Sequence, residues 1–169
     1  MHIRPVTIGD AAVIAETTRE GFESFFEWAP ASYDAPAAAI EDERIREGLA
    51  RPDVWGLLAI DEGHVAGHVL ISQAREREEP RAEIPGLCHL WQLFIRRPWW
   101  GAGLATELNR LAVAEATRRG YERMRLHTPA GHVRARAFYE REGWETDGVE
   151  RPEPLLGIAL VEYRRVLRS

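Results

Sequence analysis

Hydrophobic and polar positions along the chain alternate between a spacing typical of strands and a spacing typical of helices. Ile3 to Val6 is predicted as a short strand, and Thr7, with Asp10 three residues later, resembles a capping box that starts a helix. In that helix the core-facing positions recur at helical spacing; they are Ile14, Thr18, Phe22 and Phe25. The chain therefore begins as a strand followed by a helix.

The next stretch predicts a second helix and an antiparallel pair of strands. The helix is expected from about Asp34 to Leu49, with a proline in its first turn. Val54 to Ile60 and His64 to Ser72 are β-rich runs joined by Asp61-Glu62-Gly63, an acidic and glycine turn typical of hairpins. The charged stretch from Arg75 to Arg81 is predicted as an exposed connection.

The second half begins with the most hydrophobic strand candidate, Leu87 to Ile95, which is expected near the centre of the sheet. A loop from Arg96 to Gly103 leads into an amphipathic helix from Leu104 that closes at Arg118-Arg119-Gly120. A strand from Tyr121 to Thr128, a helix from about Val133 to Glu142 and two final strands follow. This order predicts an α/β fold, with a mixed, mostly antiparallel sheet and helices on both faces.

Composition narrows the class of protein. The chain has 169 residues, of which 45% are hydrophobic and 29% are charged, as expected for a single domain over residues 1–169. Neither a long apolar run nor a signal segment is present, so a cytoplasmic protein without a membrane partner is expected. The net charge of −5 argues against nucleic acid and favours cationic partners such as amines. The lone Cys88 excludes an intrachain disulfide and a multi-cysteine metal cluster.

The chemistry-bearing motif is the strand, turn and helix around Trp100-Gly101-Ala102-Gly103-Leu104-Ala105. Glycines at such a turn let successive backbone N–H groups point into one concavity, and the helix N-terminus adds partial positive charge. A P-loop is excluded because the Gly-Lys-Ser/Thr sequence is missing. A dinucleotide fingerprint is excluded because Thr106 stands where its third glycine is needed. Taken alone, the motif is equally typical of an anion site and of an ordinary tight turn.

A second motif, Ala135 to Trp144, resolves this ambiguity. Together with the triplet Leu93-Phe94-Ile95 and the glycine turn, in this order and spacing, it resembles the GNAT superfamily of acyl-CoA-dependent N-acetyltransferases. The Ile3-Arg4-Pro5 strand and the tail from Asp147 to Arg164 also fit, so the resemblance covers nearly the whole chain.

The resemblance implies a donor, a set of site residues and a reaction. Acetyl-CoA is the expected acyl donor, a primary amine of a small molecule or peptide is the expected acceptor, and a homodimer is expected because dimers are common in the family. Main-chain groups of Phe94 and Ile95 would pair with the pantetheine arm. Tyr139 would lie near the thioester sulfur and assist the departing thiolate. The pyrophosphate would be held at the turn, by Trp100, Gly101, Ala102, Gly103, Leu104 and Ala105.

Two positions depart from the family pattern. Pro98 stands where Gln or Arg is frequent, so one phosphate donor is lost, although Arg96 or Arg97 could contribute charge. His132 replaces the usual asparagine, and two interpretations stay open: a contact with the cofactor, or a cap at the start of the helix.

The general base is the least determined part of the prediction. An amine must lose a proton before or during attack, and His89 stands where glutamate is frequent in the family. A free histidine titrates near pH 6.5, about right for this role, so His89 is the first candidate, followed by His127 and by Glu83 in the preceding loop.

The predicted reaction is direct attack of the amine on the thioester in a ternary complex, with the oxyanion bound by an N–H of the Leu93 to Ile95 strand and no metal required. The alternative is a non-catalytic acyl-CoA binding or sensing module.

Overall fold

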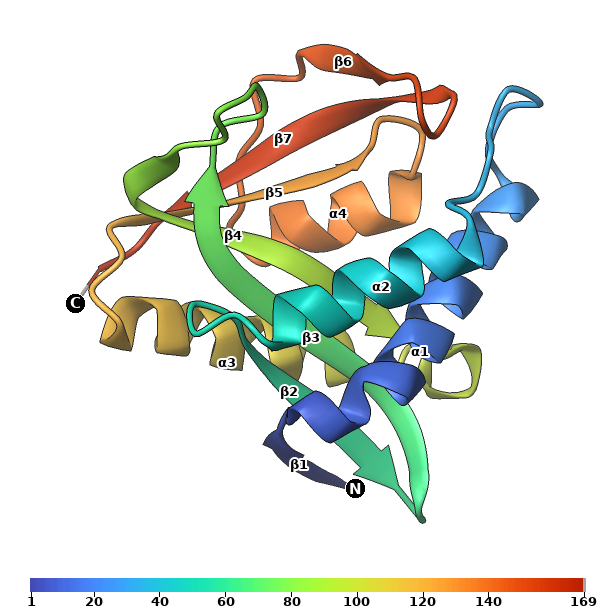
Figure 1. The fold of residues 1–169 in the computed structure, drawn as a ribbon. Helices are drawn as coiled ribbons and strands as arrows, with labels where there is room; N and C mark the ends of the chain where they lie inside the picture. The colour runs from blue at the N-terminus through green and yellow to red at the C-terminus, as the bar shows by residue number, and fades with distance from the viewer. Residues whose placement is uncertain (169) are drawn as a thin grey trace.

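The computed structural model describes residues 1–168 and contains a seven-stranded sheet in the order β1-β2-β3-β4-β5-β7-β6 (Figure 1). Neighbouring strands are antiparallel except for β4 and β5, which are parallel. The predicted mixed, mostly antiparallel α/β sheet is therefore confirmed. The strands are β1 (His2–Pro5), β2 (Trp55–Asp61), β3 (His64–Arg75), β4 (Glu83–Ile95), β5 (Arg123–Pro129), β6 (Glu150–Glu153) and β7 (Ile158–Val166).

Helices cover both faces of the sheet (Figure 1). One face carries α1 and α2 and the other carries α3 and α4, as the order of elements predicted. The helices are α1 (Ala11–Ser24), α2 (Ala38–Leu49), α3 (Leu104–Arg118) and α4 (Val133–Arg141), with short 3-10 turns η1 (Ile8–Asp10), η2 (Phe25–Glu27) and η3 (Arg97–Trp99).

Each face of the sheet has its own core. Under α3 and α4, alternate residues of β4, β5 and β7 pack together, including Cys88, Leu126 and Tyr163. Under α1 and α2, a smaller cluster contains Ile14 and Leu70. Successive residues of a strand point to opposite faces of the sheet. A strand residue between two members of one cluster therefore points to the other face.

The predicted start of the first helix is confirmed in detail. The Thr7 backbone N–H donates to Asp10 Oδ2 at 2.8 Å, which is half of the expected capping box. Arg4 of β1 adds a bidentate contact to the same carboxylate, with Nη2 2.7 Å from Oδ1. This guanidinium lowers the pKa of Asp10 to about 2, so the carboxylate stays charged and ties β1 to the helix.

Two boundary predictions were wrong. The second helix begins at Ala38 rather than near Asp34. The Asp34 backbone N–H donates to the carbonyl oxygen of Leu156, in the loop between β6 and β7, at 2.9 Å, and this contact keeps Asp34 outside the helix. The strands on either side of the exposed connection are longer than expected, since β3 runs to Arg75 rather than Ser72 and β4 starts at Glu83 rather than Leu87. Glu83 is therefore a strand residue and not a loop residue.

Within residues 1–168, every helix is too short or too polar to cross a lipid bilayer.

Candidate acetyl-CoA and amine site

The site is built on a gap in the sheet. β4 and β5 pair only from Leu87 to His89 and from Arg123 to Arg125, although both strands continue beyond these residues. Figure 1 shows the two strands separating toward their carboxyl ends, with α4 behind the gap. We call the separated parts, Leu90–Ile95 of β4 and Leu126–Pro129 of β5, the β4–β5 wedge. Their facing edges have backbone N–H and C=O groups free to bind an extended ligand.

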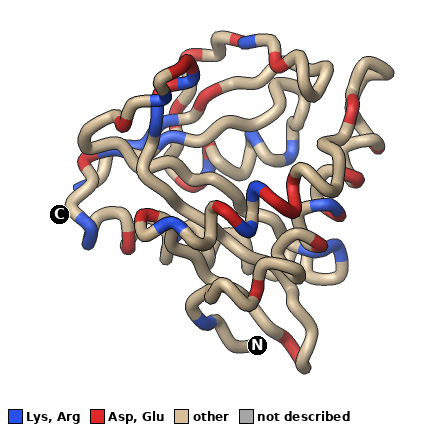
Figure 2. Tube along the Cα trace, in the orientation of Figure 1, with Lys and Arg blue, Asp and Glu red and all other residues tan. Residues whose placement is uncertain are grey.

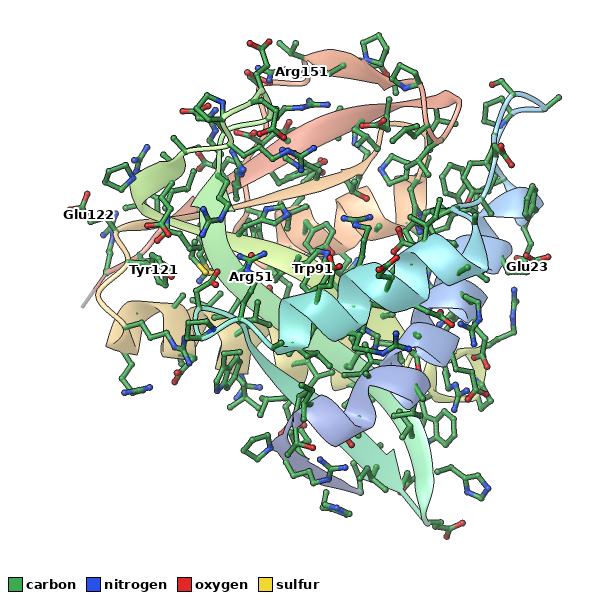
Figure 3. The ribbon with its side chains drawn as sticks, viewed as in Figure 1. Glu23, Arg51, Trp91, Tyr121, Glu122 and Arg151 are labelled. Carbon is green, nitrogen blue, oxygen red and sulfur yellow. The ribbon has the colours of Figure 1, made fainter. Side chains whose placement is uncertain are left out.

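A β-bulge lies at the start of the wedge. Leu70 of β3 pairs with Gln92 and Ile71 pairs with Leu90, so Trp91 is an extra residue in β4. The Trp91 ring packs against α2 so closely that a Cβ added to Gly48 would lie 2.4 Å from it, and Figure 3 shows Trp91 between α2 and the sheet. A bulge re-aims the backbone groups that follow it, which here are those of Gln92 to Ile95.

A buried polar cluster holds this bulge. The Gln92 side-chain oxygen lies 3.0 Å from the Thr18 hydroxyl of α1 and 2.8 Å from His68 Nε2 of β3. His68 is fully buried, and burial lowers its pKa to about 4, so it is neutral at physiological pH. The cluster fixes α1 to both strands where the wedge begins.

The glycine turn has the geometry that an anion site needs. Gly101 and Gly103 have φ values of 78° and 82°, and nothing lies within 4 Å of a Cβ built on either one. The turn leads directly into the N-terminus of α3 at Leu104. An open concavity at a helix N-terminus fits a phosphate group, so the residues from Trp100 to Ala105 are compatible with their predicted role.

Trp100 is flanked by two guanidinium groups. Arg97 lies 4.5 Å and Arg134 of α4 lies 4.1 Å from the Trp100 ring centre, and the indole N–H donates to the Ile95 carbonyl oxygen at 2.7 Å. Trp100 thus joins the glycine turn, the end of β4 and α4. Arg134 was not identified from sequence, because its proximity to the turn depends on how α4 docks.

Arg96 does not contribute charge to the turn in this structure. Its guanidinium donates to Glu20 at 2.9 and 2.8 Å and to Glu16 at 2.7 Å, both on α1. Arg97 is therefore the better of the two candidates named to offset Pro98, although it also contacts Glu27.

Tyr139 lies in α4 on the core side of the wedge. It is 8% exposed and packs against Phe138, Trp144 and Tyr163, with ring centres 5.2 to 6.0 Å apart. Burial raises the pKa of Tyr139 well above its ordinary value, so the hydroxyl stays protonated at neutral pH.

His132 caps α4. Its Nδ1 accepts a long hydrogen bond of 3.4 Å from the Ala135 backbone N–H, and its ring packs on Trp28 and Phe25 at 4.7 and 5.2 Å. Burial, followed by Arg134, lowers the pKa of His132 to about 4. The capping interpretation is thus seen directly, and the contact with the cofactor stays a prediction.

His89 and His127 lie on adjacent strands, with ring centres 5.4 Å apart. Burial, with smaller contributions from His127 and Arg125, lowers the pKa of His89 to about 3, and its Nδ1 is buried without a partner in the described chain. His89 therefore binds a proton much less readily than the free histidine on which its prediction relied.

His127 has a different environment. Its Nε2 is 3.1 Å from Oε2 of Glu162 on β7, and its side chain is 23% exposed to solvent. The hydrogen bond from His127, with a smaller contribution from Arg164, lowers the pKa of Glu162 to about 2. Because a charged carboxylate can only accept, Nε2 is the donor in this contact, and in the neutral ring Nδ1 is then the acceptor. Glu162 was missed at sequence level, since its pairing with His127 depends on strand register.

The third base candidate, Glu83, is at the opposite end of β4 from the wedge. It forms an exposed ion pair with Arg75, with 2.9 Å between Nη2 and Oε1. In residues 1–168, no cluster of three His, Cys, Asp or Glu side chains has the spacing of a metal site.

Comparison with known proteins agrees with this geometry. The model of the acetyltransferase (GNAT) family matches residues 18–144, whereas a search of curated sequences gave no match. The fold resembles a GCN5-related N-acetyltransferase structure from Rhodopseudomonas palustris, with a TM-score of 0.76 and 17% identity over 98% of this chain and 95% of the other.

Two further structures are similar. One is ribosomal-protein-alanine N-acetyltransferase from Brucella melitensis, with a TM-score of 0.74 and 17% identity over 99% of this chain and 100% of the other. The other is PaiA N-acetyltransferase from Thermoplasma acidophilum in complex with coenzyme A, with a TM-score of 0.65 and 15% identity over 96% and 98% of the two chains. Acetyl-CoA is the acyl donor of the family. With the family model covering most of its length, the chain belongs to the GNAT family of acetyltransferases.

Proposed function

We propose that this acetyltransferase, acting as one domain over residues 1–169, transfers the acetyl group of acetyl-CoA to a primary amine by direct attack in a ternary complex. The observation that carries the proposal is the β4–β5 wedge, which opens beside the glycine turn. The wedge offers unpaired main chain to an extended arm, and the turn offers N–H groups to a phosphate. One continuous path thus accommodates both parts of the donor.

The donor would be held mainly by backbone. Phe94 and Ile95 would pair with the pantetheine arm, and the turn from Trp100 to Ala105 would hold the pyrophosphate. The arginines beside Trp100 supply positive charge at this place and support the proposal despite Pro98.

The chemical step needs a base for the amine and a donor for the leaving sulfur. The amine nitrogen forms a bond to the thioester carbon, the carbon–sulfur bond breaks, and the sulfur leaves with the bonding electron pair. The N–H groups of Leu93 to Ile95, re-aimed by the bulge, would stabilise the oxyanion.

We assign the proton from the amine to Nδ1 of His127 rather than to His89. Glu162 orients His127 and leaves Nδ1 as the acceptor, whereas the buried His89 has a pKa of about 3. Tyr139 would donate a hydrogen bond to the sulfur. Because burial raises its pKa, complete transfer of its proton is more costly than the roughly 2 kcal/mol expected for a free tyrosine and thiol, and the hydrogen bond itself is the proposed contribution.

The donor site is tested by Gly103→Val, with Gly63→Val as a matched control. Both glycines have nearly equal positive φ values, 82° and 81°, and open space around a built Cβ, so both variants carry similar backbone strain. Only the first places a branched side chain over the turn. We expect Gly103→Val to abolish coenzyme A binding in calorimetry and Gly63→Val to retain it; equal affinities would contradict the assignment.

The activity is tested by thiol release from acetyl-CoA over a panel of amines. Release that depends on an amine supports the transferase, whereas donor binding without release for any amine would favour the alternative, a non-catalytic acyl-CoA binding module.

A further inference from the structure

A cavity of about 710 Å³ has many charged side chains in its wall, among them Glu162, the partner of His127. Its walls come from the connection between β3 and β4, the first residues of β5, the end of β7 and Arg151 of β6, which is labelled at the top of Figure 3. Helices α1 and α2 pack over β3 and β4 and leave β5 and β7 beyond them (Figure 1). Strands β5 and β7 therefore form the floor of the cavity.

The floor side chains follow from strand alternation. Met124 and Leu126 of β5 and Val161 and Tyr163 of β7 point into the core under α3 and α4. Their neighbours point the other way. The outward side chains form two cross-strand pairs, Arg125 with Arg164 and His127 with Glu162.

The first pair brings two positive charges together. Like charges directly opposite on one face of a sheet repel each other. In addition, Arg125 has a hydrogen-bond donor without an acceptor. Its Nη2 donates to the Arg75 carbonyl oxygen at 2.6 Å, but its Nε is buried and has no partner in the described chain. A buried N–H without an acceptor is rare because it costs free energy. Arg164 donates to Glu162 and is largely exposed, at 70%.

The cavity as a whole is positive, because its four glutamates offset only the four arginines other than Arg125 and Arg164. Six arginines and four glutamates line it, a surplus of two positive charges in a chain with a net charge of −5. Figure 2 shows blue positions gathered where β5 and β7 run beside the end of β3. A carboxylate bound between Arg125 and Arg164 would accept from the exposed guanidinium of Arg164 and reduce the repulsion.

The second pair, His127 with Glu162, lies next to this anion site on the same face of the sheet. Arg125 pairs with His89 at the last position before the wedge opens. His127, the proposed base, is two residues further along β5, a Cα separation of about 7 Å. A molecule with its carboxylate at Arg125 must extend over about this distance for its other end to reach His127.

We propose that the acceptor carries a carboxylate in the same molecule as its amine, a few carbon atoms away, as in an ω-amino acid. Arg125 and Arg164 bind the carboxylate while the amine reaches His127. This inference rests on the proposed acetyl transfer, which it deepens by naming the class of acceptor.

The test compares γ-aminobutyrate and δ-aminovalerate with butylamine and pentylamine, which lack the carboxylate. We expect kcat/KM to be at least about tenfold higher for the amino acids. Arg125→Met and Arg164→Gln should each remove most of this preference, measured within each variant as the ratio of kcat/KM for the amino acid to kcat/KM for the matched alkylamine. Arg118→Gln, on α3 away from the cavity, should keep it. Two cavity variants are used because Arg125→Met also loses the contact with Arg75.

Direct binding separates failure of the inference from failure of the proposed function. Titration of γ-aminobutyrate into the protein with coenzyme A should show binding that both cavity variants weaken. If alkylamines react as well as the amino acids, or if the variants bind γ-aminobutyrate as the unaltered protein does, the carboxylate site is wrong. If binding follows the prediction but no amine releases thiol, the carboxylate site stands and acetyl transfer is wrong.

Discussion

At the scale of single residues, His89 and His127 show how environment changes the role of a histidine. They lie on neighbouring strands, yet burial leaves one without a partner for Nδ1 and the other is oriented by a carboxylate. His127→Gln should lower kcat/KM by about a hundredfold at neutral pH, which is a typical contribution of a general base.

His89→Asn is the comparison for this prediction. It should leave kcat/KM at neutral pH nearly unchanged, because a group with a pKa of about 3 binds a proton too weakly to act as the base. A loss of kcat/KM in His89→Asn and not in His127→Gln would reverse the assignment.

Tyr139→Phe tests the leaving-group contact. The Tyr139 ring packs against three aromatic neighbours, and removal of one oxygen keeps this ring, so α4 should stay intact. We expect kcat to fall by about tenfold to a hundredfold, as for loss of one hydrogen bond to a charged group, with coenzyme A affinity nearly unchanged. Unchanged kcat would remove Tyr139 from the mechanism.

At the scale of elements, the contact between α1 and β4 depends on Gly21. A Cβ added to Gly21 would lie 2.1 Å from the Phe94 ring, which also packs on Phe22 and His68. Gly21→Ala should therefore destabilise the protein by roughly 1–3 kcal/mol, although alanine is the better helix former. Urea unfolding measures the change. Gly9→Ala, with only an ordinary contact at 3.6 Å, should be nearly neutral; equal effects would contradict the packing argument.

The elements also show what sequence could and could not predict. The capping box, the Asp61–Gly63 turn and the glycine turn are local, so spacing alone placed them. The bulge at Trp91, the separation of β4 from β5 and the pairing of Glu162 with His127 depend on strand register, which a single sequence does not determine. The start of α2 was misplaced because it depends on another long-range contact, the hydrogen bond between Asp34 and Leu156.

At the scale of the whole molecule, buried neutral histidines make stability depend on pH. His68, His89 and His132 have pKa values of about 4, 3 and 4, all below the ordinary 6.5. Between about pH 6.5 and pH 4 the unfolded chain binds protons that the folded chain does not, so stability falls as pH falls. For the fully buried His68 this amounts to about 3 kcal/mol at most.

Urea unfolding between about pH 7 and pH 4.5 measures this dependence, since the carboxylates with lowered pKa values titrate mainly below that range. His132→Asn should flatten the slope and keep the fold, because asparagine is a good helix cap. His2→Asn, at an exposed strand end, should not change the slope, and a similar slope in both variants would contradict the prediction.

The β4–β5 wedge has a consequence for hydrogen exchange. A sheet normally protects its central amides, but the amides of Leu90–Ile95 and Leu126–Thr128 that point into the wedge have no partner strand there, in the middle of seven strands. These amides should exchange with deuterated solvent faster than those of β2 and β3 when the protein is free. If the donor completes the sheet as an added strand, coenzyme A should slow exchange within the wedge, and mass spectrometry would map the bound arm onto individual strand segments.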